Sequence, residues 1–199
     1  LIKIGGLGDV GGTLPPALKN LPLDQTQQTE IDVRIAIPYH DKLKQIAWPS
    51  EWVLNSKIQS KRGFRDIYIS RALNTEVPLY LIDGVPIRNA GIYSNNTHTD
   101  LEKYAFFCMA AFEMCRRLDW KPDGLHAHDW HAALSVKKLA QIRKYDAFFS
   151  DTKSLFTIHN LPYSGGDHPD ILDLYDIPPA FDLDIPAYLR NLPMAIGLD

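Results

Sequence analysis

The second half of the chain alternates between helical and extended sequence patterns, and this alternation restricts the possible folds more than any other feature. Residues 100–118 contain no proline or glycine and place apolar side chains on one helical stripe. The patterns then predict a short strand over residues 122–128, a helix over 131–144 and a second strand over 154–158. Strands that alternate with helices predict an α/β fold with a parallel sheet flanked by helices.

The first half predicts a glycine-rich loop and further strands. Five of the 12 glycines lie in the first 12 residues, which predicts a tight loop, and a helical turn is expected over residues 15–19. Residues 31–38 alternate apolar with charged residues and end at a proline, as a strand does, and similar patterns occur at 64–70 and 77–82. We expect one domain over residues 1–199, with the Gly- and Pro-rich residues 161–184 as a candidate flap.

Composition and charge exclude several classes of partner. The chain has 199 residues, of which 45% are hydrophobic and 23% charged, as in ordinary globular domains. The net charge of -3 provides no basic field for phosphate backbones, so nucleic acid is not an expected partner. The longest apolar run, residues 104–112, is far shorter than the roughly 20 residues that cross a membrane, so no membrane span is expected.

The two cysteines are expected to have a packing role. Cys108 and Cys115 lie seven residues apart in the predicted helix, a separation of about 10.5 Å, which is too long for a disulfide. A reduced, cytosol-like compartment is therefore expected.

The first motif is the glycine-rich segment Lys3-Ile-Gly-Gly-Leu-Gly-Asp9. A glycine-rich loop that opens a helix can direct backbone N–H groups at an anion, and a neighbouring lysine adds a positive charge. The glycine spacing fits neither the dinucleotide fingerprint nor a P-loop. Phosphate binding and a plain turn both remain open as interpretations of this motif.

The second motif is His126-Ala-His-Asp-Trp-His131, at the end of a predicted strand. Three histidines in six residues suggest a transition-metal site, because alternate residues of a strand point the same way. The order of Asp129 and Trp130 departs from the His-x-His-x-Asp-His pattern, and no acidic or cysteine cluster completes a ligand shell. We therefore expect no metal, and the histidines either pack at the strand end or take part in a site.

The third motif, Phe156-Thr-Ile-His-Asn160, is an apolar strand that ends in two polar residues. His159 and Asn160 would lie at the carboxyl edge of the sheet, in the same layer as Asp129. Ligands of parallel α/β sheets bind at this edge. The convergence of separate strand ends on one crevice favours a binding site over a structural role.

Taken together, KIGGLGDVGGTLPPAL, HAHDWHAAL and FTIHNLPYSG resemble the amino-terminal domain of bacterial glycogen synthase and plant starch synthase. The resemblance spans nearly the whole chain. It implies a Rossmann-like domain, the first of the two domains of a GT-B type glycosyltransferase, without the second, nucleotide-binding domain. In the family a β-strand also leads into the motif lysine, and in this chain only Leu1 and Ile2 precede that lysine.

The resemblance implies transfer of glucose from ADP-glucose or UDP-glucose to the non-reducing end of an α-1,4-glucan with retention of configuration. No cofactor is implied, and the compartment would be the bacterial cytoplasm or a plastid. Because the carboxyl-terminal domain would hold much of the donor, the chain by itself is expected to be inactive. The alternatives are a glucan-binding or regulatory module without transferase activity and, less favoured, a metal-dependent hydrolase.

The resemblance also assigns roles on the donor side. Lys3, with the backbone of Gly5 and Gly6, would approach the donor diphosphate, and Asp9 would close that loop. His159 would lie beside the donor glucose, flanked by Asn160.

On the acceptor side, Asp129 would line the glucose and acceptor pocket. Trp130 would be a platform for an acceptor sugar ring, and Tyr93 a weaker one. Lys3, Asp129 and His159 are the expected catalytic residues.

Overall fold

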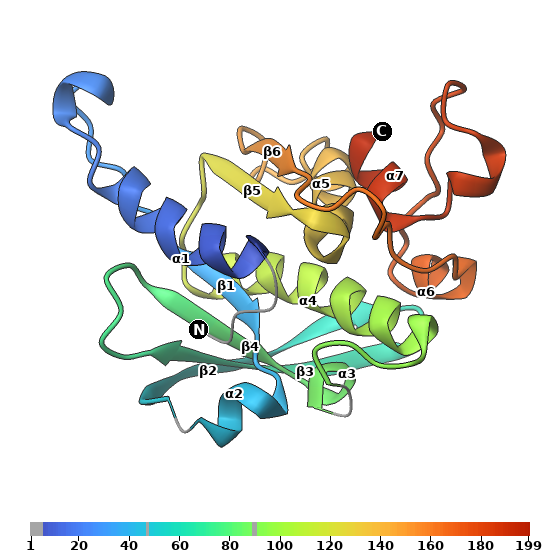
Figure 1. The fold of residues 1–199 in the computed structure, drawn as a ribbon, viewed down its shortest axis with the longest axis horizontal. Helices are drawn as coiled ribbons and strands as arrows, with labels where there is room; N and C mark the ends of the chain where they lie inside the picture. Colours follow the sequence, from blue (N-terminus) through green and yellow to red (C-terminus); the bar gives the residue numbers. More distant parts are fainter. Residues whose placement is uncertain (1–5, 47, 89–90) are drawn as a thin grey trace.

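The computed structural model describes residues 6–46, 48–88 and 91–199 and shows an α/β fold with two sheets (Figure 1). A four-stranded sheet has the strand order β1-β4-β3-β2, and a two-stranded sheet contains β5 and β6. The strands are β1 (Ile35–Pro38), β2 (Ser50–Ser60), β3 (Gly63–Ala72), β4 (Leu79–Asp83), β5 (Gly124–His128) and β6 (Lys153–Thr157). The predicted α/β class is confirmed.

Helices connect and cover these strands. They are α1 (Gly6–Lys19), α2 (Asp41–Gln45), α3 (Val85–Arg88), α4 (Thr97–Arg117), α5 (Asp129–Ile142), α6 (Pro169–Leu174) and α7 (Pro193–Leu198), with short 3₁₀ turns η1 (Leu23–Gln25) and η2 (Ala187–Leu189). Each helix and strand predicted in the second half is present, with bounds that differ by a few residues. Within the described residues, no helix has the length and apolar character needed to cross a membrane.

The sheets are only partly parallel. The pairs β1/β4 and β5/β6 are parallel, as expected, but β3 pairs antiparallel with both β2 and β4. Only two residues, Lys61 and Arg62, connect β2 to β3, and so short a connection forces an antiparallel hairpin. Strand β2 was not predicted from the sequence, and the hairpin makes the larger sheet mixed.

Helix α4 forms the centre of the core. The side chain of Asn96 caps its first turn by accepting hydrogen bonds from the backbone N–H groups of His98 and Thr99 at 2.9 and 3.3 Å. Leu101 and Phe106 of α4 are fully buried in the same hydrophobic cluster as Ile67 of β3. Helix α4 also packs against α5, which brings β5 and the start of α5 over the core (Figure 1).

The glycine-rich segment is helical from Gly6 onward, so the prediction of a loop over its described residues is wrong. Gly8, Gly11 and Gly12 lie inside α1, where each glycine costs about 1 kcal/mol relative to alanine. None of the α1 residues is buried. The carboxyl end of the helix is held by tertiary contacts, because Lys19 Nζ donates to the Glu76 carbonyl oxygen at 2.7 Å.

A large cavity lies between the two sheets. Each of β1 and β5 has one edge without a strand partner among the described residues, and residues of both strands line one cavity of about 1100 Å³. Apolar side chains of α4, including Phe107 and Ala111, form another wall, and Leu7 and Leu18 of α1 border it.

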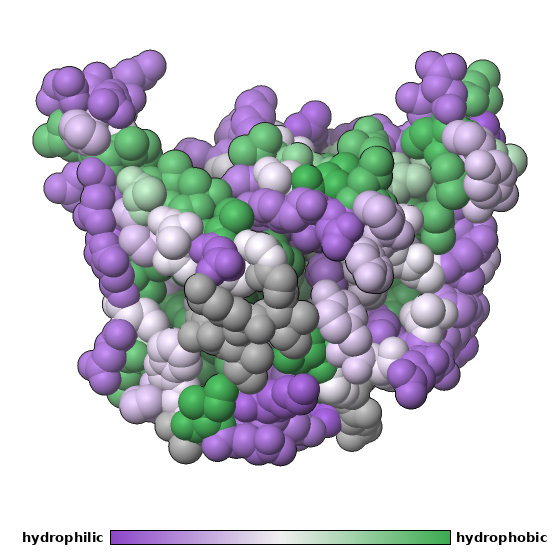
Figure 2. Space-filling model, viewed as in Figure 1, coloured by the Kyte–Doolittle hydropathy of each residue, from purple (hydrophilic) through white to green (hydrophobic). Residues whose placement is uncertain are grey.

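Two segments project from the body of the molecule, one after α1 and one around η2 (Figure 1). Both carry hydrophobic surface (Figure 2). Their exposed hydrophobic side chains are Leu21, Leu23, Phe181, Leu183 and Tyr188.

Candidate active site

Three of the predicted site residues meet at the carboxyl ends of β5 and β6. Asp129 directly follows β5 and is the first residue of α5, whereas His159 and Asn160 follow β6. The two strands are parallel neighbours, with His128 opposite Thr157 in the register. The structure therefore brings these three residues together at the edge where the sequence predicts a site.

Asp129 joins the two strand ends directly. Its Oδ1 atom accepts hydrogen bonds from the backbone N–H groups of His159 at 2.7 Å and Asn160 at 3.2 Å. The residue is 5% exposed and has a φ of 54°, a left-handed conformation that costs about 1–2 kcal/mol for most residues and that Asp adopts more readily. The carboxylate therefore fixes the backbone that carries His159.

The histidine rings at this edge lie against one another. His128 Nδ1 lies 2.9 Å from His159 Nε2, and their rings are stacked with centroids 5.2 Å apart. The ring of His126 lies 4.1 Å from that of His128. Burial lowers the pKa of His128 to about 4, and the nearby His126 and His159 act in the same direction. His128 is therefore neutral at pH 7 and can share a hydrogen bond with His159.

The three histidines of the second motif do not converge on one point. His126 Nε2 is hydrogen-bonded to Thr157 Oγ1 at 2.8 Å, His128 to His159, and His131 to Tyr93. Across residues 6–46, 48–88 and 91–199, no three His, Cys, Asp or Glu side chains are placed to hold a metal ion. The geometry of this motif gives no support to the hydrolase alternative.

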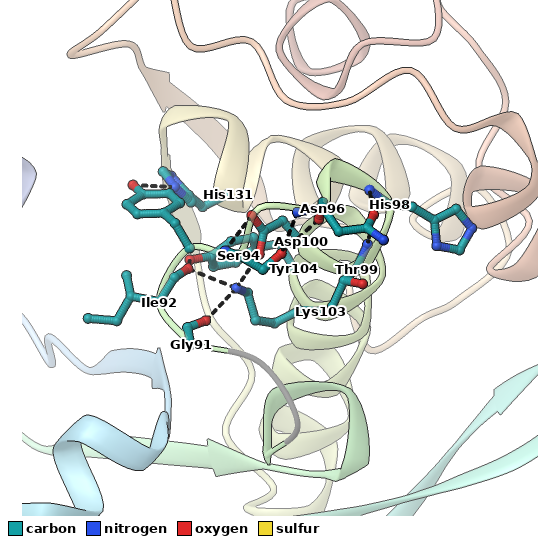
Figure 3. Close-up of polar contacts among 11 residues, drawn as sticks. Gly91, Ile92, Ser94, Asn96, His98, Thr99, Asp100, Lys103, Tyr104 and His131 are labelled. Atoms are coloured by element: carbon teal, nitrogen blue, oxygen red, sulfur yellow. Dashed lines mark hydrogen bonds and ion pairs between the residues drawn. The ribbon is translucent and has the colours of Figure 1, made fainter.

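His131 lies at the candidate site, and sequence reasoning found no role for it beyond metal binding or packing. Its Nε2 atom lies 2.9 Å from the hydroxyl oxygen of Tyr93 (Figure 3). Its ring contacts those of Tyr104 and Trp130, with centroids 4.6 and 4.4 Å away. Burial lowers the pKa of His131 to about 4, so the ring is neutral at pH 7. Its position in the sequence could have indicated a role in the site, because it lies two residues after Asp129, in the first turn of α5.

Trp130 does not have the surface position that the resemblance implied. Its side chain is 7% exposed and packs against Tyr104, with ring centroids 4.9 Å apart, and against Met194. Trp130 is directed into the core between α4 and α7, so its role as an open sugar platform needs correction. Tyr93 is 51% exposed and offers the more accessible aromatic ring.

The glycine-rich motif is only partly visible. Lys3 and Gly5 lie outside the described residues. Gly6 is the first residue of α1 and Asp9 lies in the first turn of the helix, where both are exposed. Leu7 and Gly8, between them, line the same cavity as Tyr93 and His131.

Two walls of the cavity are unsuited to a sugar. The walls formed by β1 and α4 are apolar, whereas sugar hydroxyls require polar partners. Polar and aromatic side chains gather at the strand ends, where Tyr93, His128 and His131 belong to the lining.

The two cysteines have the packing role that was expected. Cys108 and Cys115 are free and buried. Burial raises the pKa of both thiols to about 12, so neither is a reactive thiolate at pH 7.

The fold is that of an α/β domain, and its candidate ligand site lies at the carboxyl ends of two parallel strands. Residues 1–195 match the family model described as the starch synthase catalytic domain. The chain is 39% identical over 171 residues to a glycogen synthase of Vibrio parahaemolyticus, covering 83% of this chain and 33% of the relative. It is 32% identical over 196 residues to a glycogen synthase of Clostridium beijerinckii, covering 94% and 36%.

The chain belongs to the starch synthase catalytic domain family. The fold agrees, because the catalytic domain of starch synthase IV from Arabidopsis thaliana, bound to ADP and acarbose, superposes with a TM-score of 0.65 at 21% identity. This match covers 81% of this chain and 32% of that structure, and the fold is that of a GT-B glycosyltransferase. The chain spans about a third of the length of the glycogen synthases it matches.

Proposed function

We propose that these residues form the acceptor-side half of the active site of a glycogen or starch synthase. The full-length enzyme would transfer glucose from a nucleotide sugar to the non-reducing end of an α-1,4-glucan with retention of configuration. The observation that carries the proposal is the Asp129–His159 arrangement at the carboxyl ends of β5 and β6, in a chain of this family.

The site chemistry supports a reaction on one face of the donor sugar. Retention by double displacement needs two carboxyl groups about 5 Å apart, one acting as nucleophile. At this edge Oδ1 of Asp129 is engaged by two backbone N–H groups. In the proposed step the acceptor hydroxyl oxygen bonds to the anomeric carbon, the bond to the diphosphate breaks, and the hydroxyl proton passes to a diphosphate oxygen.

The protein would contribute positioning and electrostatic stabilisation. Lys3 and the backbone N–H groups of Gly5 and Gly6 would stabilise the departing diphosphate. His159 and Asn160 would lie beside the donor glucose, and Asp129 and Tyr93 would line the acceptor pocket. No cofactor and no metal ion are needed in this scheme.

The comparisons also favour particular substrates. The starch synthase IV structure is described as bound to ADP and acarbose, which supports ADP-glucose as donor and an α-glucan as acceptor. The named glycogen synthases are bacterial, which favours the cytoplasm over a plastid. We propose that a second domain completes the donor site.

The test is a glucosyl-transfer assay on the full-length protein, with ADP-glucose or UDP-glucose and a glycogen primer. We expect transfer from ADP-glucose and none from the 199-residue chain alone. His159→Ala and Asp129→Ala should each lower kcat by about 100-fold or more, equivalent to about 3 kcal/mol. Lys3→Ala should raise the KM for the donor.

The control for these variants is Lys57→Ala, at an exposed position on β2, which should leave turnover unchanged. Unchanged turnover in folded His159→Ala and Asp129→Ala would contradict the assigned roles. If the folded full-length protein transfers glucose from neither donor but binds glycogen, the glucan-binding module becomes the better assignment.

A further inference from the structure

The segment that carries Tyr93 has no regular secondary structure, and buried side chains of α4 hold it in place (Figure 3). Lys103 is fully buried, and its ammonium group donates to the carbonyl oxygens of Gly91 at 2.7 Å and Ile92 at 2.8 Å. It also donates to Asp100 Oδ1 at 2.7 Å. All three N–H groups of this ammonium therefore have acceptors.

Asp100 and Tyr104 hold the same segment from neighbouring positions on α4. Both carboxylate oxygens of Asp100, which is 6% exposed, accept from the backbone N–H of Ser94 at 3.1 and 3.0 Å. The hydroxyl of Tyr104 donates to the carbonyl oxygen of Ile92 at 2.7 Å. Hydrogen bonds thus connect Ile92 and Ser94, the residues on either side of Tyr93, to the first two turns of α4.

The buried ion pair between Lys103 and Asp100 is poorly explained by a contribution to the overall stability of the fold. Removing an ammonium and a carboxylate from water is energetically costly, and apolar replacements of buried ion pairs are often neutral or stabilising. Burial pulls the pKa of Lys103 below its ordinary value, although the Asp100 carboxylate opposes that shift. The hydrogen bonds of both charged groups go to one short segment and to each other, so their effect is to fix that segment.

The position of this segment decides where the Tyr93 side chain lies. Tyr93 is half exposed at the end of the cavity, and its hydroxyl is 2.9 Å from His131 Nε2. Tyr104, whose hydroxyl donates to the Ile92 carbonyl oxygen, also contacts the ring of His131.

We propose that Lys103 is a positioning residue: with Asp100 it fixes residues 91–96 so that Tyr93 stays against His131. In the full-length enzyme this arrangement would present the Tyr93 ring to the acceptor glucan, and that part rests on the proposed function. Lys103 touches no substrate in this scheme and acts only through Tyr93.

The direct test is an NMR comparison of the 199-residue chain with its Lys103→Met variant, both folded at the temperature used. We expect the nuclear Overhauser contacts between the Tyr93 and His131 rings to disappear and the Ser94 amide signal to shift. The matched control is Lys138→Met, because Lys138 is also partly buried and donates to the backbone carbonyl oxygen of Tyr175, away from the site. That variant should keep the Tyr93–His131 contacts.

A second variant is needed if Lys103→Met fails to fold because it leaves the buried Asp100 carboxylate without its ion-pair partner. Lys103→Met combined with Asp100→Asn leaves no buried charge, and it should lose the same ring contacts. Retention of the Tyr93–His131 contacts in a folded variant without the lysine would overturn the proposal.

Binding of maltoheptaose separates a positioning role from a purely structural one. In the full-length protein, Lys103→Met and Tyr93→Ala should each raise the KM for maltoheptaose about tenfold, with little change in the KM for the nucleotide sugar. The double variant should be no worse than Tyr93→Ala, because Lys103 acts through Tyr93. Additive effects, or an equal rise in both KM values, would contradict the proposal.

Failure of the proposed function can be recognised independently. If the unmodified full-length protein neither binds maltoheptaose nor transfers glucose, the glucan assignment is wrong. The NMR comparison still decides whether Lys103 holds Tyr93 against His131.

Discussion

The Oδ1 atom of Asp129 accepts a hydrogen bond from the backbone N–H of His159 at 2.7 Å. The two residues lie 30 positions apart in the sequence and on different strand ends, yet one buried carboxylate fixes the spacing between them. The two proposed catalytic groups are therefore coupled, and a change at Asp129 moves the backbone that presents His159.

Replacing Asp129 tests this coupling through stability. Asp129→Ala removes the acceptor of two N–H groups and places alanine at a φ of 54°, so it should lower the free energy of unfolding by about 2 kcal/mol or more. Asp129→Asn keeps an acceptor oxygen and tolerates this backbone, so it should cost clearly less. Urea unfolding measures both values, and equal losses would contradict the proposed reason.

Acid should destabilise the domain through its partly buried histidines. Burial holds the pKa of His131 at about 4, whereas the unfolded chain has the ordinary value near 6.5. As the pH falls below 6.5 the unfolded state takes up a proton that the folded state does not, so stability decreases until about pH 4. Between pH 7.5 and pH 5 the free energy of unfolding should therefore fall by about 1–2 kcal/mol less in the His131→Gln variant than in the unmodified chain. Urea unfolding at the two pH values measures this difference. An equal fall in the free energy of unfolding of the variant and the unmodified chain would exclude His131 as its cause.

The cysteines should resist thiol reagents while the domain is folded. Burial raises the pKa of Cys108 and Cys115 to about 12, so almost no thiolate exists at pH 8. Labelling with a disulfide reagent should be slow in buffer and fast in denaturant. Cys108→Ala should lower stability and leave glucosyl transfer by the full-length protein intact. Rapid labelling of both thiols in buffer would show that the core around α4 opens readily.

Two glycines should respond oppositely to alanine. A Cβ atom at Gly84 would lie 2.3 Å from the ring of Phe106, which is fully buried and cannot yield, so Gly84→Ala should cost about 1–3 kcal/mol. A Cβ atom at Gly124 meets nothing within 4 Å, so Gly124→Ala should be neutral or slightly stabilising. Thermal unfolding of the two variants gives the comparison. A neutral Gly84→Ala would show that the Phe106 ring moves aside.

Much of the fold could be predicted because its elements have strong local patterns. The apolar stripe of α4, from Leu101 to Cys115, and the short strands β5 and β6 on either side of α5 can be predicted without tertiary information. Strand β2 carries polar and apolar residues in a weaker pattern, and its pairing with β3 depends on the two-residue connection. The glycines of α1 favour a loop by local propensity, but this segment is helical beside the cavity.

The sequence by itself determined the α/β class, the family, and the strand ends that carry Asp129, His159 and Asn160, because periodicity and motif order are local properties of the chain. Only the tertiary structure decided that Trp130 is buried, that Tyr93 meets His131, and that Lys103 and Asp100 hold the Tyr93 segment. These features depend on contacts between residues distant in the sequence. Their energies come from burial and hydrogen-bond geometry, which no local pattern contains.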